Sequence, residues 1–333
     1  MRKACITGGA GFIGSTLADA LQRQGVEVVV LDDFRTGHPQ FIEELLSRPG
    51  AHLVQADVLD DTALQRAMTG CDWVFHLQAN ADVRHGLEHP LLDLEQNTIA
   101  TSRVLEAMRT CEVRNILFSS TGSVYGEPEV FPTPEDAPFP VQTSLYGASK
   151  LACEGLIAAY AVGFELTAVI CRFVSILGER YTHGHVVDFF RALRQDPTRL
   201  RVLGDGKQTK SYLYVQDCIK AMLMAAQHHE GMPGARIYNL GTEQTLTVDQ
   251  SIEIITDRLG IAPIVEYSGG QRGWVGDSPL IQLDTARVRG LGWRPQVTIK
   301  DAVVRTLDWL VDNEWASKIP KTTDARPSHR PSV

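Results

Sequence analysis

Tyr146 and Lys150 have the side-chain types and the spacing that proton-transfer chemistry needs. They lie four positions apart in the segment SLYGASK. If this segment is helical, as its apolar pattern suggests, both side chains lie on one helix face. A phenol is a poor base at neutral pH because its reference pKa is about 10, but a neighbouring lysine cation favours the phenolate. The pair could therefore exchange a proton with a substrate hydroxyl group. An aromatic–lysine pair at this spacing is also common on solvated helices, so the pair alone does not define a site.

A run of hydroxyl-bearing residues, FSSTGSVYG over residues 118–126, follows an apolar strand-like segment. Thr121 and Ser123 lie just beyond the expected end of that strand, whereas Ser119 and Ser120 are interpreted as part of the strand end. A hydroxyl there could hydrogen-bond the oxygen on which a tyrosine acts. Whether it does so depends on the fold that positions both segments.

A glycine-rich turn, ITGGAGFIG, lies between the first apolar run and a helical pattern. Gly8, Gly11 and Gly14 recur every three residues, with Phe12 and Ile13 inside the turn. Glycines let such a turn tighten and let the backbone approach a pyrophosphate, and the following helix N-terminus supplies N–H donors. The turn predicts dinucleotide binding, although a plain glycine-rich strand–helix turn has the same appearance.

Acidic residues at the ends of the next two strands refine this prediction. Asp32, with Asp33 beside it, lies about 20 residues beyond the glycine turn, where a carboxylate accepts hydrogen bonds from ribose hydroxyls and repels a 2′-phosphate. This favours NAD over NADP, while Arg35, also assigned to the cofactor, keeps NADP open as an alternative. Asp57 and Val58 follow the third strand and could contact the adenine, but a simple loop aspartate is equally consistent.

The elements that must position these residues alternate between strand-like runs and helical patterns. Continuous β-branched runs separated by helix-length segments indicate a parallel sheet covered on both faces. We therefore predict an α/β fold with a Rossmann-type doubly wound sheet. The expected strands are residues 3–7, 26–31, 52–55, 73–76, 115–118 and 167–171.

The pattern becomes less regular after residue 174, with short strands at 211–215, 236–240 and 263–267 and an amphipathic helix at 248–259. We assign these to a smaller, mixed α/β C-terminal lobe that binds the substrate. The expected division is a dinucleotide-binding domain over 1–174, with some later segments returning to it, a substrate lobe over 175–315 and a disordered proline-containing tail over 316–333.

Composition restricts the function classes. The formal net charge of −8 disfavours nucleic-acid binding, and no apolar run reaches the length of about 18 residues that a membrane-spanning helix needs. Six cysteines without a C-x-x-C pair predict neither a zinc site nor a disulfide framework. We expect a cytoplasmic protein without a metal centre.

These motifs together resemble those of the extended short-chain dehydrogenase/reductases, in particular the UDP-glucose 4-epimerase-like branch of nucleotide-sugar epimerases and dehydratases. The resemblance covers about residues 2–312 and includes the segment HLQANADVR after the fourth strand. It implies bound NAD, a Thr121–Tyr146–Lys150 triad with Ser123 lining the site, and cofactor contacts from Leu77, Ala79 and the tyrosine–lysine pair.

The resemblance also bears on the reaction. In the 4,6-dehydratases of this family the loop after the fifth strand resembles Thr-Asp-Glu, and in the decarboxylases a glutamate follows the threonine by two positions. Here those positions hold Gly122 and Ser123, so the loop looks most like that of the 4-epimerases. The expected activity is epimerisation through a transient 4-keto sugar, with hydride taken and returned by tightly bound NAD. The alternatives are a dehydratase or 4-ketoreductase, or a non-catalytic NAD-binding sensor.

Substrate contacts also follow from the resemblance. Lys210 in QTKSYLYV and Arg272 in GGQRGWVGD are candidate anchors for the diphosphate of a nucleotide sugar, most readily a UDP-sugar. Ser175 stands where relatives carry a substrate-binding asparagine, and Arg84 lies after the fourth-strand loop that approaches the sugar. Each cation could instead be a surface residue. Family members form homodimers through two long helices, here 92–110 and 144–160, although the same faces could pack on the chain's own sheet.

Overall fold

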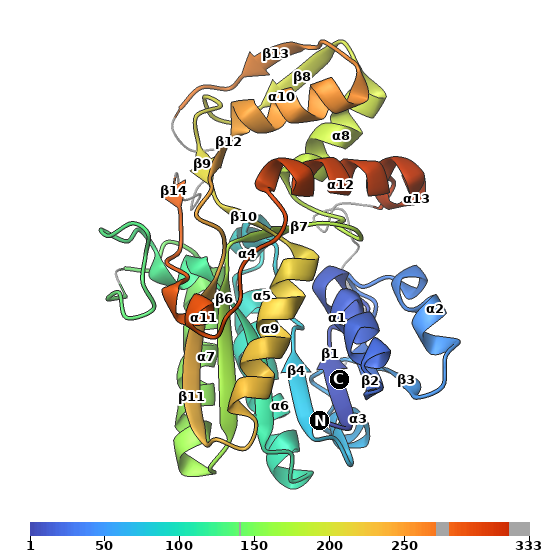
Figure 1. Ribbon diagram of the computed structural model, residues 1–333, viewed down its shortest axis with the longest axis vertical. Helices are drawn as coiled ribbons and strands as arrows, with labels where there is room; N and C mark the ends of the chain where they lie inside the picture. The colour runs from blue at the N-terminus through green and yellow to red at the C-terminus, as the bar shows by residue number, and fades with distance from the viewer. Residues whose placement is uncertain (140, 271–279, 320–333) are drawn as a thin grey trace.

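A seven-stranded parallel sheet forms the centre of the protein, with strand order β11-β6-β5-β4-β1-β2-β3 (Figure 1). The computed structural model describes residues 1–139, 141–270 and 280–319, without the side chains of residues 84, 85 and 87. The predicted doubly wound Rossmann-type sheet is confirmed. In chain order its strands are β1 (Lys3–Thr7), β2 (Glu27–Asp32), β3 (Ala51–Gln55), β4 (Trp73–His76), β5 (Asn115–Thr121), β6 (Thr167–Phe173) and β11 (Gly234–Leu240).

Helices cover both faces of this sheet, because alternate side chains of each strand point to opposite faces. In β1, Ala4 and Ile6 join one buried cluster with α1 and α9, whereas Cys5 joins a second cluster with α3, α6 and α7. Burial on both sides explains why the strands read as continuous apolar runs in the sequence. The helices are α1 (Phe12–Arg23), α3 (Asp61–Met68), α6 (Ala100–Thr110), α7 (Leu145–Gly163) and α9 (Val215–His229).

The smaller lobe lies beyond the carboxyl ends of the strands (Figure 1). It contains α8 (His185–Gln195), β8 (Arg199–Val202), α10 (Val248–Leu259), β13 (Ile264–Tyr267), α12 (Ile299–Asp312) and α13 (Glu314–Ser317). Short segments connect it to the sheet: β7 (Ser175–Leu177), β9 (Thr209–Lys210), β10 (Tyr212–Tyr214), β12 (Leu246–Thr247), β14 (Leu280–Ile281) and α11 (Ala286–Gly290). The predicted helix at 248–259 is confirmed, and it begins with a capping box between Thr247 and Gln250.

The assignment of residues 236–240 to the smaller lobe was wrong. β11 pairs in parallel with β6 from Gly234↔Thr167 to Leu240↔Phe173 and forms the edge of the main sheet. Its preceding helix, α9, packs against α1 and β6, so both elements return to the dinucleotide-binding domain. A parallel pairing across so long a connection depends on tertiary packing, which a short apolar run does not reveal.

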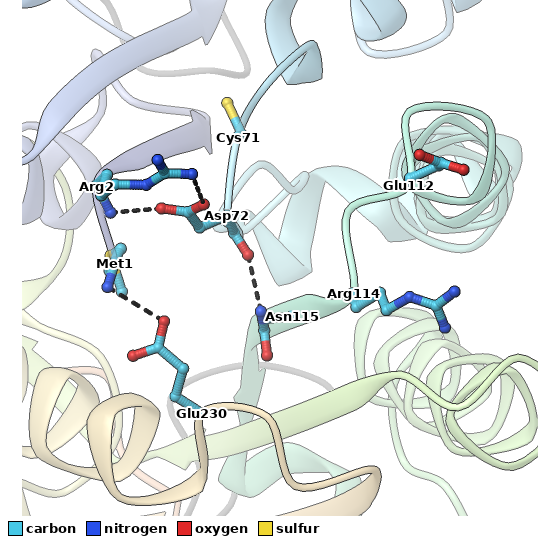
Figure 2. Close-up of a pocket in the computed structure, with 8 residues that line it drawn as sticks. All are labelled: Met1, Arg2, Cys71, Asp72, Glu112, Arg114, Asn115 and Glu230. Carbon is cyan, nitrogen blue, oxygen red and sulfur yellow. Dashed lines mark hydrogen bonds and ion pairs between the residues drawn. The ribbon is translucent and has the colours of Figure 1, made fainter.

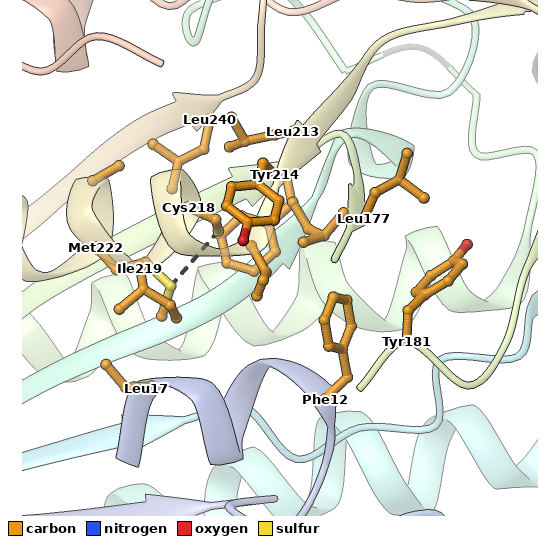
Figure 3. Close-up of a cluster of buried hydrophobic side chains, with 14 of the residues drawn as sticks. Phe12, Leu17, Leu177, Tyr181, Leu213, Tyr214, Cys218, Ile219, Met222 and Leu240 are labelled. Atoms are coloured by element: carbon orange, nitrogen blue, oxygen red, sulfur yellow. Dashed lines mark hydrogen bonds between the residues drawn. The ribbon is translucent and has the colours of Figure 1, made fainter. Parts of the chain in front are cut away.

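Aromatic and aliphatic side chains join the smaller lobe to the glycine turn (Figure 3). Tyr181, which follows β7, lies edge-on to Phe12 of α1 with ring centroids 5.5 Å apart. Next to it, the Arg180 guanidinium forms an ion pair of 2.7 Å with Asp19 of α1. These contacts seat the segment after β7 directly over the start of α1.

The segment predicted as one helix over 92–110 is broken into three pieces: α5 (Pro90–Asp93), the π-helix η2 (Leu94–Ile99) and α6. Its buried face carries polar side chains, including Asp93, Asn97 and Thr101. π-helical turns are rare and occur frequently at functional sites. The remaining short elements are η1 (Pro39–Phe41), α2 (Glu43–Leu46), α4 (Val83–Glu88) and η3 (Gly122–Tyr125).

Residues 316–319, the first part of the predicted disordered tail, are ordered. Trp315 of α13 packs against Phe41 and Trp309, and Ala316 is fully buried. Apolar burial therefore keeps the chain ordered beyond residue 316. Residues 320–333 of the predicted tail lie outside the described residues.

Candidate active site

The glycine turn brings backbone against backbone at the start of α1. A Cβ atom placed on Gly14 would lie 2.1 Å from the Gly8 carbonyl oxygen, and one on Gly8, whose φ is +70°, would lie 2.8 Å from Cα of Gln78. Gly11 is the N-cap of α1, with Phe12 and Ile13 in its first turn. The turn is thus a side-chain-free cradle at a helix N-terminus, which fits a dinucleotide pyrophosphate.

Asp32 ties the turn to the end of β2. Its Oδ2 accepts a hydrogen bond from the backbone N–H of Ala10 (2.9 Å), and Oδ1 accepts one from Phe34 (2.8 Å). Burial raises the pKa of Asp32, and the two N–H donors oppose that rise. Because each carboxylate oxygen can accept a second hydrogen bond, the group remains able to accept from ribose hydroxyls.

Arg35 forms ion pairs with two carboxylates. Its guanidinium lies 3.0 Å from Asp33 and 3.0 Å from Asp57. A guanidinium held in this way is not available as a free partner for a 2′-phosphate, which agrees with NAD rather than NADP. Val58 is only 3% exposed, and its side chain belongs to the core cluster behind β2. The side chain is therefore not accessible to a bound cofactor.

A buried histidine at the end of β4 joins the turn to α6. Thr7 Oγ1 lies 2.7 Å from Nδ1 of His76, and Thr101 Oγ1 lies 3.0 Å from Nε2. Burial lowers the pKa of His76 to about 3, so the ring is neutral. Leu77 and Ala79 follow as half-buried residues, as expected for a cofactor-lining loop.

Gln78 lies between Leu77 and Ala79, and its side-chain oxygen Oε1 is buried without a hydrogen-bond partner among the described residues. Its amide nitrogen donates to Gln96 on η2 at 2.9 Å. Gln78 lies directly against Gly8, so this spare acceptor borders the glycine cradle. The cradle and the free acceptor both fit a polar dinucleotide; sequence reasoning had not singled out Gln78.

Helix α7 and strand β5 bring together the three residues of the predicted triad. Ser144 caps α7 by accepting a hydrogen bond from the Gly147 N–H at 3.0 Å, which places Tyr146 in the first turn. Thr121 ends β5 and lies close enough to the Tyr146 hydroxyl to lower the pKa of that group. Thr121 Oγ1 also contacts Ser123, at 3.1 Å to the backbone N and 3.2 Å to Oγ. The hydroxyl loop and the tyrosine therefore form one site.

The expected help from Lys150 in lowering the Tyr146 pKa is not seen. The buried ammonium donates to the Ser119 carbonyl oxygen at 2.8 Å and lies 4.5 Å from the centre of the Phe118 ring. Burial raises the pKa of Tyr146, with Thr121 opposing the rise. Burial also lowers the pKa of Lys150 to about 8. Helical spacing placed both residues on one face, but it did not determine where the long lysine side chain points.

The candidate substrate residues lie on neighbouring short strands. Ser175 is exposed and pairs across from Tyr212, and half-buried Lys210 lies two residues before Tyr212. Burial, together with the nearby Lys210 charge, lowers the pKa of His185 to about 3. Ser211 is fully buried and donates a hydrogen bond to the Thr242 carbonyl oxygen at 3.0 Å. The structure thus brings Ser175 and Lys210 to one edge of the smaller lobe.

Two other predicted substrate residues cannot be placed. The side chain of Arg84 and the whole of Arg272 lie outside the described residues.

Sequence reasoning missed a buried polar group on η2. Asn97 donates to Ser149 Oγ of α7 at 2.8 Å and accepts from the Asn80 backbone N–H at 2.8 Å. Asp93, one turn earlier, is 1% exposed. Asp93, Asn97 and Thr101 recur every four residues on an otherwise amphipathic segment, and this polar stripe was the available signal.

A separate hollow of about 550 Å³ lies at the opposite, amino ends of the strands (Figure 2). Two ion pairs line it: the amino terminus of Met1 with Glu230, and Arg2 with Asp72. It contains none of the predicted site residues. The site residues instead gather at the carboxyl ends of the strands, the side on which open α/β sheets bind ligands.

Over the parts of the chain that the structure describes, no cluster of three or more histidine, cysteine or acidic residues could hold a metal ion. Within the same parts, each helix is too short or too polar to cross a membrane.

A Rossmann sheet with a glycine cradle, an acidic residue ending β2 and a Tyr-x-x-x-Lys centre beside a hydroxyl loop defines a nicotinamide-dependent enzyme of the short-chain dehydrogenase/reductase type. A sequence profile of the NAD dependent epimerase/dehydratase family matches residues 4–241. The chain belongs to this family, and NAD is its cofactor.

Relatives lie among the epimerases. The chain is 32% identical to a UDP-glucose 4-epimerase of Mycolicibacterium smegmatis, over 92% of this chain and 98% of the relative. A crystal structure of UDP-galactose 4-epimerase is 36% identical with a TM-score of 0.84, covering 94% of this chain and 100% of the other. A UDP-glucuronic acid 4-epimerase from Bacillus cereus, in complex with UDP-glucuronic acid and NAD, is 26% identical with a TM-score of 0.86, covering the same shares.

Proposed function

We propose that this protein is an NAD-dependent nucleotide-sugar 4-epimerase that acts through a transient 4-keto sugar. The observation that carries the proposal is the composition of the loop after β5, where Thr121 and Ser123 supply hydroxyls beside Tyr146 and neither of the two positions after Thr121 carries a carboxyl group. Relatives named for 4-epimerisation of UDP-sugars support the same reaction.

The proposed chemistry assigns each residue a distinct task. The glycine cradle and Asp32 would hold NAD, which would supply the hydride chemistry at the sugar C4, removal from one face and return to the other. Tyr146 takes the proton of the C4 hydroxyl and later returns it, while Thr121 hydrogen-bonds the same oxygen. Lys150, held by the Ser119 carbonyl, places a positive charge at the base of the site. Burial raises the pKa of the Tyr146 phenol, so its proposed action as a base requires a lower pKa in the filled site.

Elimination of water lacks a catalyst in this arrangement. Gly122, the first position after Thr121, is buried and carries no side chain, and its Cα faces the Phe173 carbonyl and the side chains of Ile281 and Leu283. The nearby buried carboxylate of Glu154 is held by Arg172 at 2.6 Å. A dehydratase would need a free acid and base near the sugar C5 and C6, and this loop supplies neither.

Substrate affinity is assigned to the diphosphate. Lys210, at the edge of the smaller lobe, offers a cation to a phosphate group, and Arg272 is the second proposed anchor. Ser175 is exposed beside this edge and is proposed to contact the sugar. Binding energy from the diphosphate would leave the sugar free to turn between hydride removal and return. A UDP-sugar is the proposed substrate class.

The test is proton NMR of the purified holoprotein with a panel of UDP-, dTDP-, GDP- and CDP-sugars and uronic acids, without added cofactor. We expect one sugar to reach an equilibrium mixture with its C4 epimer, because the hydride is returned within each turnover. A product that has lost water, or activity that requires added NADH or NADPH, would instead identify a dehydratase or a ketoreductase.

We also propose that two copies associate through η2 and α7. Leu94 and Ile99 of η2 are 47% and 40% exposed, and Leu145 of α7 is 41% exposed. Apolar residues exposed together on adjacent helices are typical of a face buried by a symmetric partner. Sedimentation velocity should give the mass of two 36.7 kDa chains; a monomer at micromolar concentration would reject this proposal.

A further inference from the structure

We propose that Asp93 is a positioning residue of this active site: its buried carboxylate fixes the loop after β4 and the π-helix η2 against α7, and thereby holds both the cofactor loop and Tyr146. Asp93 is the last residue of α5 and is only 1% exposed. The triad chemistry described above does not use it.

The carboxylate joins two segments that are distant in the chain. Oδ1 of Asp93 accepts a hydrogen bond from Asn80 Nδ2 at 2.8 Å and another from Asn97 Nδ2 at 3.2 Å. Asn80 belongs to the loop after β4, directly beyond Leu77 and Ala79. A charged acceptor makes stronger hydrogen bonds than a neutral one, so these contacts restrain that loop more firmly than amide–amide contacts would.

The same contacts continue to Tyr146 itself. Asn97 donates to Ser149 Oγ at 2.8 Å, and Ser149 Oγ donates to the Tyr146 carbonyl oxygen at 2.8 Å. A polar chain therefore runs from Asp93 through Asn97 and Ser149 to the backbone of the catalytic tyrosine. Displacing its first member would shift the first turn of α7 relative to Thr121.

Gly86 of α4 packs directly on the carboxylate. A Cβ on Gly86 would lie 2.2 Å from Asp93 Oδ2, so alanine at this position must push the carboxylate away. Gly86 has no positive φ, so an alanine there would not strain the backbone. The chain thus offers two independent ways to disturb one contact: removing the carboxylate, or displacing it with its charge intact.

Asp93 also acts on the charges of the triad. Burial dominates both pKa values, and the negative charge of Asp93 raises the pKa of Tyr146 and of Lys150. For Lys150 burial lowers the pKa most, and Asp93 opposes that lowering together with the larger effects of Cys153 and Glu154. Electrostatics and geometry therefore both connect Asp93 to the triad.

The experiment compares Asp93→Ala, Asp93→Asn and Gly86→Ala with wild type. The first readout is the NAD that copurifies with the folded protein, released by denaturation and quantified per chain. The second is kcat and KM for the epimerised sugar. Glu88→Gln, an exposed acid in α4, is the matched control and should match wild type in both.

We expect Asp93→Ala and Gly86→Ala to retain less NAD and to lower kcat about 10- to 100-fold, the range that a misplacement of about 1 Å can cause. KM should stay within about threefold of wild type, because neither Asp93 nor Gly86 is assigned to the diphosphate. Asp93→Asn keeps one acceptor oxygen and should recover part of both losses. A folded Asp93→Ala protein with wild-type NAD content and kcat would overturn the proposal.

The kinetic readout rests on the proposed epimerase function, whereas the NAD readout does not. If wild type converts no nucleotide sugar, the proposed function fails, and NAD content still decides the role of Asp93. If Asp93→Ala does not fold, Gly86→Ala decides: a loss of NAD supports the role, and wild-type NAD content refutes it.

Discussion

Replacing Tyr146 by phenylalanine is expected to lower kcat by roughly 10²- to 10⁴-fold, the usual contribution of a general acid–base group. The ring and its packing at the start of α7 remain, so only the hydroxyl that meets Thr121 is lost. Neither the glycine cradle nor Asp32 is touched, and copurifying NAD should therefore stay at the wild-type level. Initial rates of C4 epimerisation with the best sugar of the panel, alongside the NAD content, give the measurement.

Tyr160→Phe is the matched control for this prediction. Tyr160 lies on the same helix, and its hydroxyl bonds Glu106 at 2.5 Å, away from the triad. Its removal should leave kcat within about twofold of wild type, as expected for a group remote from the chemistry. Equal rates for wild type and Tyr146→Phe would remove the catalytic assignment. Equal losses in both variants would show that the effect comes from α7 as a whole.

The main sheet was predictable because its strands are buried on both faces. Six apolar runs separated by helix-length segments indicated the doubly wound order directly, and all six are strands of the sheet. β11 was not assigned to the sheet because its partner, β6, lies more than 60 residues earlier in the chain. A local pattern contains no information on such a pairing.

The site was predictable only where spacing fixes geometry. Glycine spacing in the turn and the position of Asp32 predicted the observed cradle, because a strand–turn–helix unit has few alternatives. The direction of the Lys150 side chain was not predictable, since a long flexible chain follows local acceptors such as the Ser119 carbonyl. The role of Asp93 depends on contacts to Asn80 and Asn97 that only the packed fold brings together.

A buried ion pair behind the catalytic loop provides the largest expected effect on stability. Glu154 of α7 and Arg172 of β6 lie 2.6 Å apart and are 4% and 0% exposed. Ser120, next to Thr121, donates to the same carboxylate at 2.5 Å. Replacing Glu154 by alanine would leave a buried guanidinium without its counter-charge, which costs about 3–5 kcal/mol. Urea unfolding of the holoprotein should show this loss as a lower midpoint with an unchanged slope.

The expected loss of stability in Glu154→Ala comes from the unpaired charge of Arg172 rather than from the lost attraction of the ion pair. Two further variants separate these causes. Replacing both residues by methionine removes the buried charge and should recover much of the stability. Asp61→Ala breaks the exposed Asp61–Arg103 pair, whose distance is 2.7 Å, and should cost no more than about 1 kcal/mol. Similar losses for Glu154→Ala and Asp61→Ala would show that burial does not amplify the penalty. Because Ser120 depends on Glu154, we also expect a lower kcat in the folded variant, as the end of β5 loosens beneath Thr121.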